Sequence, residues 1–222
     1  MKIKPHQLQK KYLDDSLVLS VTGMSNVGKS FWSKRLRELG FTFFSCDDWI
    51  EANLAEELVK IGYGGIEDMA RWLGQPYDKQ YQQTQQAYLE WEEQSLYHVF
   101  AHIAENGGNW VIDTTGSMVH LPVISQEKLK ANSVVVCLDA GEDMVDQMYE
   151  KFLSYPKPVV WADLFEHVKG EKYRDSLRRS YPKLLRYRSQ KYREIADVLI
   201  PRDRIPFDSS VEEFFELLKE NL

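Results

Sequence analysis

Residues 23–30 carry glycine, lysine and serine at the spacing that binds phosphate groups. The segment reads GMSNVGKS and matches the pattern G-x-x-x-x-G-K-[ST] at every fixed position. In such a loop, glycines let backbone N–H groups turn toward phosphate oxygens at a helix N-terminus, where the helix dipole also favours anions. We therefore expect a nucleotide to be bound here. The candidate binding residues are Gly23, Met24, Ser25, Asn26, Val27, Gly28, Lys29, Ser30 and Phe31.

Lys29 and Ser30 supply the two side chains that phosphoryl chemistry requires from this motif. The Lys29 ammonium would reach the β- and γ-phosphates, and the Ser30 hydroxyl would ligate Mg²⁺. The alternative is a strand-to-helix turn that contains glycines and binds nothing. The flanking sequence favours phosphate binding, because an apolar run at 17–21 precedes the loop and a helical pattern over 31–39 follows it and stops at Gly40.

Two aspartates stand where predicted strands end. Asp47 follows the apolar run 41–45, and Asp113 follows the run 109–112. Ligands bind beyond the carboxyl ends of strands in open α/β sheets, so both carboxylates would face the phosphate loop. Asp47 would orient or deprotonate an acceptor hydroxyl, and both aspartates could join Ser30 at a Mg²⁺ site. The alternatives are a helix cap at Asp47 and an Asx-turn at Asp113.

The order of predicted elements indicates a single α/β domain over residues 1–222. Apolar runs predict five strands, and helical patterns fill the intervals, which is typical of a parallel sheet covered by helices on both faces. The expected class is therefore a three-layer α/β/α fold. The predicted strands cover residues 17–21, 41–45, 109–112, 133–138 and 198–200.

The interval 47–106 is longer than a simple crossover between strands. Its pattern predicts a helix over 48–60, a break at 62–65, a short helix up to Leu73 and a long helix over 78–105. An insertion of this kind commonly carries the second substrate. Aromatic residues along the long helix could stack on a substrate ring or pack against neighbouring helices.

Composition and charge favour a cytoplasmic protein without a membrane partner. The 222-residue chain has a formal net charge of −6. It contains no apolar stretch long enough to span a membrane and no N-terminal targeting segment. Its two cysteines, Cys46 and Cys137, lack metal-ligand spacing, and we expect them to be reduced.

One basic segment departs from the acidic average. Residues 169–204 contain twelve Lys and Arg against five Asp and Glu. The segment could be a solvated helix face, a track for nucleic acid or a cationic flap over phosphates, and the phosphate loop favours the flap. Pro182 lies within this segment, so we expect it to separate two helices, the first belonging to a lid.

Residues 16 to about 200 resemble the shikimate kinase family of P-loop kinases. The segment LGFTFFSCDDWIE at 39–51 resembles the family's L-G-Y-x-F-I-D-x-D-E-L-I-E and places Asp47 on the second family aspartate. The resemblance implies a three-layer core with a five-stranded parallel sheet, a helical substrate-binding insertion over 47–106, a mobile lid over about 151–180, and MgATP as the phosphoryl donor.

Two later segments extend the resemblance. YPKPVV at 155–160 resembles the lid motif R-P-L-L, with Lys157 where the family has arginine. RSQKYREIAD at 188–197 resembles the closing segment R-x-P-L-Y-x-E-x-A-D and places Arg188 on a substrate-binding arginine. The resemblance thus implies that Lys157 closes over the phosphates and that Arg188 holds an anionic or polar group of the acceptor.

Three departures from the family pattern concern the acceptor and the metal. Ser45 takes the place of the first family aspartate, which helps to hold Mg²⁺. Thr115, Gly116 and Ser117 take the place of the triple-glycine turn that contacts the substrate. No arginine occurs within 78–93, whereas the family uses one there to grip a carboxylate. We therefore expect the phosphoryl-transfer machinery to be kept and the acceptor to differ.

The predicted activity is an ATP-dependent kinase acting on a small hydroxylated metabolite. Two alternatives remain. A nucleotide or polynucleotide-end kinase would use residues 169–204 as a backbone track, and its affinity for nucleic acid would fall steeply with salt. A nucleotide-responsive binding module would bind ATP without turnover. The sequence does not determine the oligomeric state.

Overall fold

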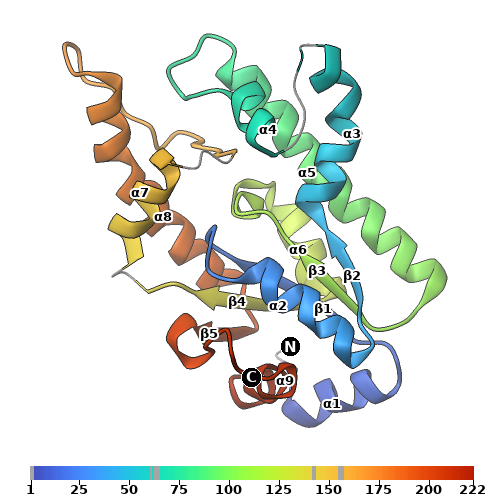
Figure 1. The fold of residues 1–222 in the computed structure, drawn as a ribbon. Coiled ribbons are helices and arrows are strands. Elements are labelled where there is room, and N and C mark those ends of the chain that lie inside the picture. Colours follow the sequence, from blue (N-terminus) through green and yellow to red (C-terminus); the bar gives the residue numbers. More distant parts are fainter. Residues whose placement is uncertain (1–2, 61, 63–65, 142–143, 155–157) are drawn as a thin grey trace.

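Five parallel strands form the centre of the structure, in the order β2-β3-β1-β4-β5 (Figure 1). The computed structural model describes the chain except for residues 1–2, 61, 63–65, 142–143 and 155–157. All five predicted strands are confirmed, with bounds within one or two residues of those expected. They are β1 (Val18–Gly23), β2 (Thr42–Ser45), β3 (Trp110–Asp113), β4 (Val134–Asp139) and β5 (Val198–Pro201).

The central strands are apolar because both of their faces are covered. In β4 every residue from 134 to 138 is buried, and β3 is buried along its whole length. A strand exposed on one face would instead alternate apolar and polar side chains. The near-continuous apolar runs of the sequence therefore correspond to the interior of a three-layer domain.

Helices cover the two faces of the sheet as a parallel topology requires. On one face, α2 (Lys29–Arg35) packs against β1, β2 and β3 and contacts α9 (Val211–Glu220). On the other, α6 (Val123–Asn132) packs against β4, and α8 (Tyr173–Ile195) packs against β1 and β4 (Figure 1). Right-handed crossovers explain the division, because the connection from β1 to β2 runs in the opposite direction to those that follow.

The remaining helices lie at the N-terminus and around the carboxyl ends of the strands. The N-terminal helix α1 (Pro5–Leu13) packs against α9. The predicted insertion contains three helices that contact one another, α3 (Cys46–Lys60), α4 (Ile66–Leu73) and α5 (Tyr81–Asn106). Helix α7 (Val145–Ser154) packs against α8. Within the described residues, no helix has both the length and the apolar character needed to cross a membrane.

Helix α8 contradicts the prediction that Pro182 separates two helices. The helix runs unbroken from Tyr173 to Ile195, with the proline inside it. An interior proline removes one backbone hydrogen bond and costs roughly 3 kcal/mol. Leu177 and Leu184, on either side of Pro182, are buried in the core. Burial of this face offsets the local cost, which the sequence pattern did not reveal.

Candidate active site

The predicted phosphate loop joins the end of β1 to the start of α2, in the order that the sequence predicted. Gly23 ends the strand, and Gly28 precedes the helix with a φ of 104°. Gly23 has a φ of 136°, and a Cβ atom there would lie 2.5 Å from the carbonyl oxygen of Leu138. A side chain at either glycine would therefore strain or displace the loop.

Lys29 begins α2 and folds back against its own loop. Its side chain is nearly buried, and its Nζ donates a hydrogen bond to the carbonyl oxygen of Met24 at 3.0 Å. Ser30 follows Lys29 and lines the same cavity. The ammonium group is thus held at the helix N-terminus, where a phosphate would find both a positive charge and the helix dipole.

Asp113 lies at the end of β3, level with Ser45 in β2 and Val21 in β1. Its carboxylate is buried, and Oδ1 has no hydrogen-bond partner among the described residues. Burial raises the pKa of Asp113, whereas the Lys29 ammonium and the Ser30 hydroxyl lower it. A buried carboxylate oxygen without a partner is costly, so this position suits a bound cation or one of the cation's water ligands.

The oxygen atoms around Ser30 and Asp113 fit a magnesium ion held mainly by a nucleotide. In the described part of the chain, no group of three or more His, Cys, Asp or Glu residues is placed to hold a metal. Mg²⁺ in phosphate-transferring sites usually takes only one or two protein oxygens and completes its shell with phosphates and waters. Asp47 lies close enough to raise the pKa of Asp113, and its role as a third ligand stays a prediction.

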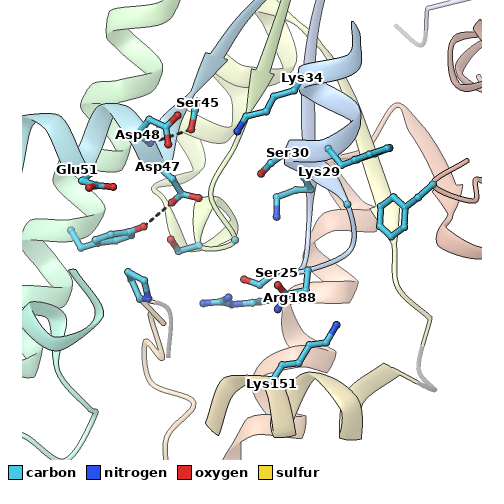
Figure 2. Close-up of a pocket in the computed structure, with 18 residues that line it drawn as sticks. Ser25, Lys29, Ser30, Lys34, Ser45, Asp47, Asp48, Glu51, Lys151 and Arg188 are labelled. Carbon is cyan, nitrogen blue, oxygen red and sulfur yellow. Dashed lines mark hydrogen bonds between the residues drawn. The ribbon is translucent and has the colours of Figure 1, made fainter. Parts of the chain in front are cut away.

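A cavity of about 800 Å³ joins the phosphate loop to the insertion. Figure 2 shows Asp47 and Glu51 on one side, Lys29 and Ser30 on the other, and Arg188 with Lys151 below them. The cavity thus brings residues from distant parts of the sequence to one place. Its lining is Ser25, Asn26, Gly28, Lys29, Ser30, Phe31, Lys34, Ser45, Asp47, Asp48, Glu51, Tyr88, Gly116, Ser117, Lys151, Pro158, Arg188 and Phe207.

Asp47 lies in the first turn of α3, and the hydroxyl of Tyr88 donates to its Oδ1 at 3.3 Å. Burial raises the pKa of Tyr88 well above its usual value, with the charge of Asp47 adding to the shift, so Tyr88 remains a hydrogen-bond donor. Ser45 caps this helix instead of Asp47, because its Oγ accepts a hydrogen bond from the backbone N of Asp48 at 3.1 Å. The helix cap, which was the alternative to a functional role for Asp47, is therefore Ser45 and not Asp47.

The predicted substrate turn at 115–117 is divided between the cavity and the interior. Gly116 and Ser117 line the cavity, whereas Thr115 is buried behind it. The Thr115 hydroxyl donates to Oε1 of Glu92, and the Ser117 hydroxyl donates to Oε2 at 2.6 Å. The sequence did not single out Glu92, which lies among several glutamates on a long helix and differs from them only by its burial.

Arg188 projects from α8 toward the cavity and is held by two acceptors. Its Nε donates to His120 Nε2 at 3.2 Å, and Nη2 donates to the carbonyl oxygen of Val160 at 2.7 Å. Burial, with the charge of Arg188 adding to it, lowers the pKa of His120 to about 3, so the imidazole is neutral and accepts. Arg188 also lies close to the substrate turn, because a Cβ atom added at Gly116 would be 3.4 Å from its Nη1.

Two exposed phenylalanines flank the mouth of the phosphate loop. Phe31, predicted at this site, and Phe207, which the sequence did not indicate, pack edge to face with ring centroids 4.8 Å apart. Phe207 also lies beside Gly28, where a Cβ atom would approach its ring to 3.0 Å, and the guanidinium of Arg202 lies 4.0 Å from its ring centroid. Both rings line the cavity and offer an apolar surface to a bound ring.

Within the predicted lid, about 151–180, the loop 158–172 between α7 and α8 is bonded to the insertion and to α8. The side-chain oxygen of Gln85 in α5 accepts from the backbone N of Trp161 at 3.0 Å and of Ala162 at 2.8 Å, and the Trp161 ring is fully buried. Lys157 lies outside the described residues, so its position at the phosphates stays a prediction. Two lysines that the sequence did not indicate, Lys34 and Lys151, line the cavity.

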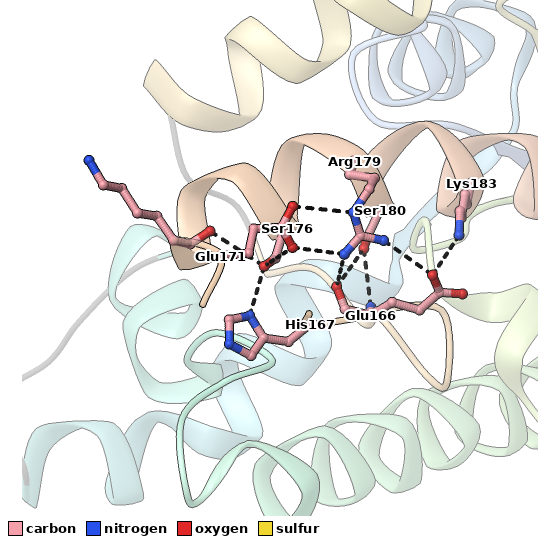
Figure 3. A network of polar contacts seen from close by, with 8 residues as sticks. Glu166, His167, Glu171, Ser176, Arg179, Ser180 and Lys183 are labelled. Atoms are coloured by element: carbon pink, nitrogen blue, oxygen red, sulfur yellow. Dashed lines mark hydrogen bonds and ion pairs between the residues drawn. The ribbon is translucent and has the colours of Figure 1, made fainter. Parts of the chain in front are cut away.

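Several basic side chains of segment 169–204 are paired with carboxylates. Arg179 bridges Glu166 and Glu171 and thereby fastens the 158–172 segment to α8 (Figure 3). Such pairing lowers the positive charge that α8 offers to solvent and does not favour a nucleic-acid track. The pairs on α8 are Arg179–Glu166, Arg179–Glu171, Lys183–Glu166, Lys191–Glu194 and Arg193–Asp139.

Glu92 gives rise to a prediction on stability. Burial raises its pKa from an ordinary value of 4.5 to about 7, against the lowering effect of the Ser117 and Thr115 hydroxyls. The folded state then binds the Glu92 proton more tightly than the unfolded chain does. The contribution of Glu92 to the free energy of unfolding should therefore fall as the pH rises from about 4.5 to 7, by at most about 3 kcal/mol, and it should stay constant above pH 7. Thermal unfolding should show this slope in wild type and not in Glu92→Gln; equal slopes would contradict it.

Comparison with known proteins identifies the fold. No protein-family model matches the chain, and no curated protein matches its sequence. Among solved structures, shikimate kinase from Acinetobacter baumannii in complex with shikimate is 20% identical with a TM-score of 0.60, over 94% of this chain and 97% of that one. Shikimate kinase from Bacteroides thetaiotaomicron is 20% identical with a TM-score of 0.59, over 91% and 98%.

A kinase other than shikimate kinase also has a structure similar to that of this chain. Dephospho-CoA kinase from Campylobacter jejuni is 11% identical with a TM-score of 0.51, over 91% of this chain and 96% of that one. The chain therefore has the three-layer α/β/α fold of P-loop kinases like shikimate kinase, along nearly its whole length.

Proposed function

We propose that the chain is an ATP-dependent kinase that transfers the γ-phosphoryl group of MgATP to a hydroxyl group of a small metabolite other than shikimate. One observation carries the proposal: a single cavity is lined both by the phosphate loop, through Ser25, Asn26 and residues 28–30, and by Asp47, a carboxylate that faces the loop from the insertion. Phosphoryl transfer depends on positioning and charge neutralisation more than on covalent chemistry. The kinase fold of the structural neighbours supports the same activity.

The proposal gives a role to the phosphate loop and to six side chains. The backbone of the loop surrounds the phosphates, and Lys29 stabilises the charge that develops on the transferred group. Asp47 orients the acceptor hydroxyl and accepts its proton, while Arg188 holds a polar or anionic group of the acceptor. Lys157 would close from the lid. Ser30 and Asp113 would hold a magnesium ion, which neutralises charge on the nucleotide phosphates.

The acceptor side of the cavity is lined by carboxylates. Asp47, Asp48 and Glu51 all line it, whereas Arg188 already donates two of its N–H groups to protein acceptors. A carboxylate-bearing acceptor would meet like charges here without a second arginine to grip it. The wall favours a polyhydroxylated or amine-bearing acceptor over a carboxylic acid.

Shikimate should accordingly be a poor substrate. Loss of one charge-assisted contact to a buried carboxylate costs about 2–5 kcal/mol, or roughly 30- to several-thousand-fold in affinity. We expect kcat/KM for shikimate to lie below that of the best acceptor found by screening by at least about 30-fold. Coupled measurement of ADP release with both acceptors tests this, and an ordinary kcat/KM for shikimate would show that the acceptor has not changed.

Phe207 should contribute to nucleotide affinity through the base. Loss of one aromatic contact to a base costs about 1–3 kcal/mol, so Phe207→Ala should weaken ATP binding by roughly 5- to 100-fold. Affinity for inorganic tripolyphosphate should stay unchanged, because that ligand has no ring. Tyr173→Ala is the matched control, since Tyr173 is equally exposed but does not line the cavity. Calorimetry showing equal losses for ATP and tripolyphosphate would exclude a contact to the base.

The proposed function is tested by ATP consumption against a library of hydroxylated metabolites. ADP release that depends on one acceptor, together with a phosphorylated product of the expected mass, would support it. Nucleotide binding without turnover on any acceptor would favour the binding module. Phosphorylation of polynucleotide ends, with affinity that falls steeply with salt, would favour the nucleic-acid kinase.

A further inference from the structure

Glu92 is a buried carboxylate to which the proposed mechanism gives no role. It lies in α5, is 1% exposed and does not line the cavity. Burial of a carboxylate is costly unless its oxygens are hydrogen-bonded. Both oxygens of Glu92 are bonded, and both donors come from the substrate turn: Thr115 to Oε1 and Ser117 to Oε2.

These bonds add to backbone bonds at the two ends of the turn, where the backbone N of Thr114 donates to the carbonyl oxygen of Val21 at 3.1 Å and the backbone N of His120 donates to that of Ser117 at 2.7 Å. The backbone N of Ser117 donates to Oγ1 of Thr115 at 3.1 Å, and the two hydroxyl oxygens lie 3.0 Å apart. Glu92 therefore holds both side chains of one local hydrogen-bonded unit. On the opposite side, the Tyr192 hydroxyl donates to the carbonyl oxygen of Gly116 at 2.5 Å. The turn is thus fixed between α5 and α8.

The turn lies on the acceptor side of the cavity, beside Arg188 and next to the phosphate loop. A Cβ atom at Gly116 would lie 3.4 Å from Nη1 of Arg188 and 3.5 Å from Oγ of Ser25 in the phosphate loop. Ser117 lines the cavity beside Gly116. A shift of the turn toward the cavity would therefore push against the arginine and the loop, and a shift away would widen the acceptor side.

We propose that Glu92 is a positioning residue, which fixes the 115–117 turn through the Thr115 and Ser117 hydroxyls and so sets the acceptor side of the cavity. The hydroxyls that replace glycine in this chain then serve to bind the buried carboxylate rather than the substrate directly. The effect on catalysis rests on the proposed function, whereas the effect on the turn does not.

Glu93 provides a matched control on the same helix. It also accepts hydrogen bonds from hydroxyls, from Tyr97 at 3.0 Å and from Ser125, but it does not line the cavity and, in the described part of the chain, makes no hydrogen bond to the turn. Glu92→Leu and Glu93→Leu therefore remove the same group in the same kind of contact. Only the first leaves Thr115 and Ser117 without their shared acceptor.

The first experiment measures amide hydrogen exchange in a peptide spanning the turn. Glu92→Leu should speed exchange there by at least about tenfold, and Glu93→Leu should not, because of these two glutamates only Glu92 is hydrogen-bonded to the turn. Ser117→Ala removes the hydrogen bond between Ser117 and Glu92 by changing its donor, so this variant replaces Glu92→Leu in the experiment if Glu92→Leu does not fold. The double variant should exchange no faster than Glu92→Leu. Unchanged exchange in Glu92→Leu and Ser117→Ala, or an equal change in Glu93→Leu, would overturn the proposal.

The second experiment separates positioning from general stability by kinetics. With the acceptor identified by screening, Glu92→Leu and Ser117→Ala should lower kcat by about tenfold or more, while the Kd for MgATP changes by less than about threefold. Ser117→Thr, which keeps the hydroxyl, should restore most of kcat. Equal kcat in wild type and Glu92→Leu would overturn the catalytic part. Absence of turnover in wild type would instead refute the proposed function, and the exchange experiment would then decide the inference.

Discussion

Lys29→Ala is expected to lower turnover by about 10²- to 10³-fold and to weaken MgATP binding strongly. Lys29 Nζ lies at the N-terminus of α2 and donates to the Met24 carbonyl oxygen inside the phosphate loop. In the proposed function, a positive charge fixed there would act on the transferred phosphoryl group in a largely buried setting, where removal of one stabilising donor typically costs this much. Calorimetry with MgATP, together with ADP release under saturating acceptor, measures both effects.

Lys34→Ala is the control for this prediction. Lys34 lies in the same helix and lines the same cavity, but it stands beyond the loop and near the aromatic ring of Phe43. Its removal subtracts the same charge, so a general electrostatic effect would weaken nucleotide binding equally in both variants. We expect at most a several-fold loss. Failure of folded wild-type protein to bind MgATP would refute the phosphate-loop assignment itself.

The fold could be predicted because its signals are local. Each strand is a short apolar run, and three of them end at a residue with a clear meaning: Gly23, Asp113 and Pro201. Parallel strands buried on both faces produce such runs whatever lies around them. The stop at Gly40 was equally local, since this residue takes a left-handed conformation with φ of 85° at the end of the turn that continues α2.

The interior of α8 shows where local rules fail. Pro182 is a strong breaker by propensity, yet the helix continues because buried side chains on both sides of it pack against the sheet and α7. Tertiary packing decides such cases, and a single sequence does not show which face of a helix will be buried. The division of the basic segment into a lid helix and a core helix was wrong for this reason.

The parts of the site that the sequence did not indicate are those that depend on contacts between distant segments. Glu92 and Ser117 are 25 positions apart, and His120 and Arg188 are 68 apart. Neither pair has a spacing motif, because each pair meets only after the sheet has formed. Phe207 likewise reaches Gly28 from the loop after β5. The phosphate loop could be found in advance because all of its chemistry lies in eight consecutive residues.

The charge of the cavity also follows from the fold rather than from the overall composition. The chain is acidic, and two cations of its basic segment, Arg179 and Lys183, pair with carboxylates of the 158–172 segment, as Figure 3 shows. Asp47, Asp48 and Glu51 line the side of the cavity that we assign to the acceptor, and Lys29 lines the side with the phosphate loop. In the proposed function, carboxylates on the acceptor side and cations on the phosphate side would distinguish the two substrates by charge.

Asp47→Asn should suppress turnover by about 10²- to 10⁴-fold and leave nucleotide affinity nearly intact. The carboxylate faces the cavity from the first turn of α3, with Tyr88 bonded to its Oδ1. In the proposed function it acts on the acceptor hydroxyl, an interaction that strengthens in the transition state, so its loss should appear in kcat and not in the Kd for MgATP. Single-turnover kinetics with preformed nucleotide complex separates the two quantities.

Asp113→Asn should have the opposite signature. Its buried Oδ1 has no partner among the described residues, and the carboxylate lies near Lys29 and Ser30. Removal of its charge should weaken the Mg²⁺ dependence of ATP binding, because that charge acts on the ion even through a water. Titration of ATP with and without Mg²⁺ measures this. If both aspartates only shaped the local backbone, each asparagine variant would cost well under about 1 kcal/mol and keep wild-type turnover, because the amide oxygen of Asn can accept the same hydrogen bonds. That result would leave the phosphate loop as the one part of the proposed mechanism still supported.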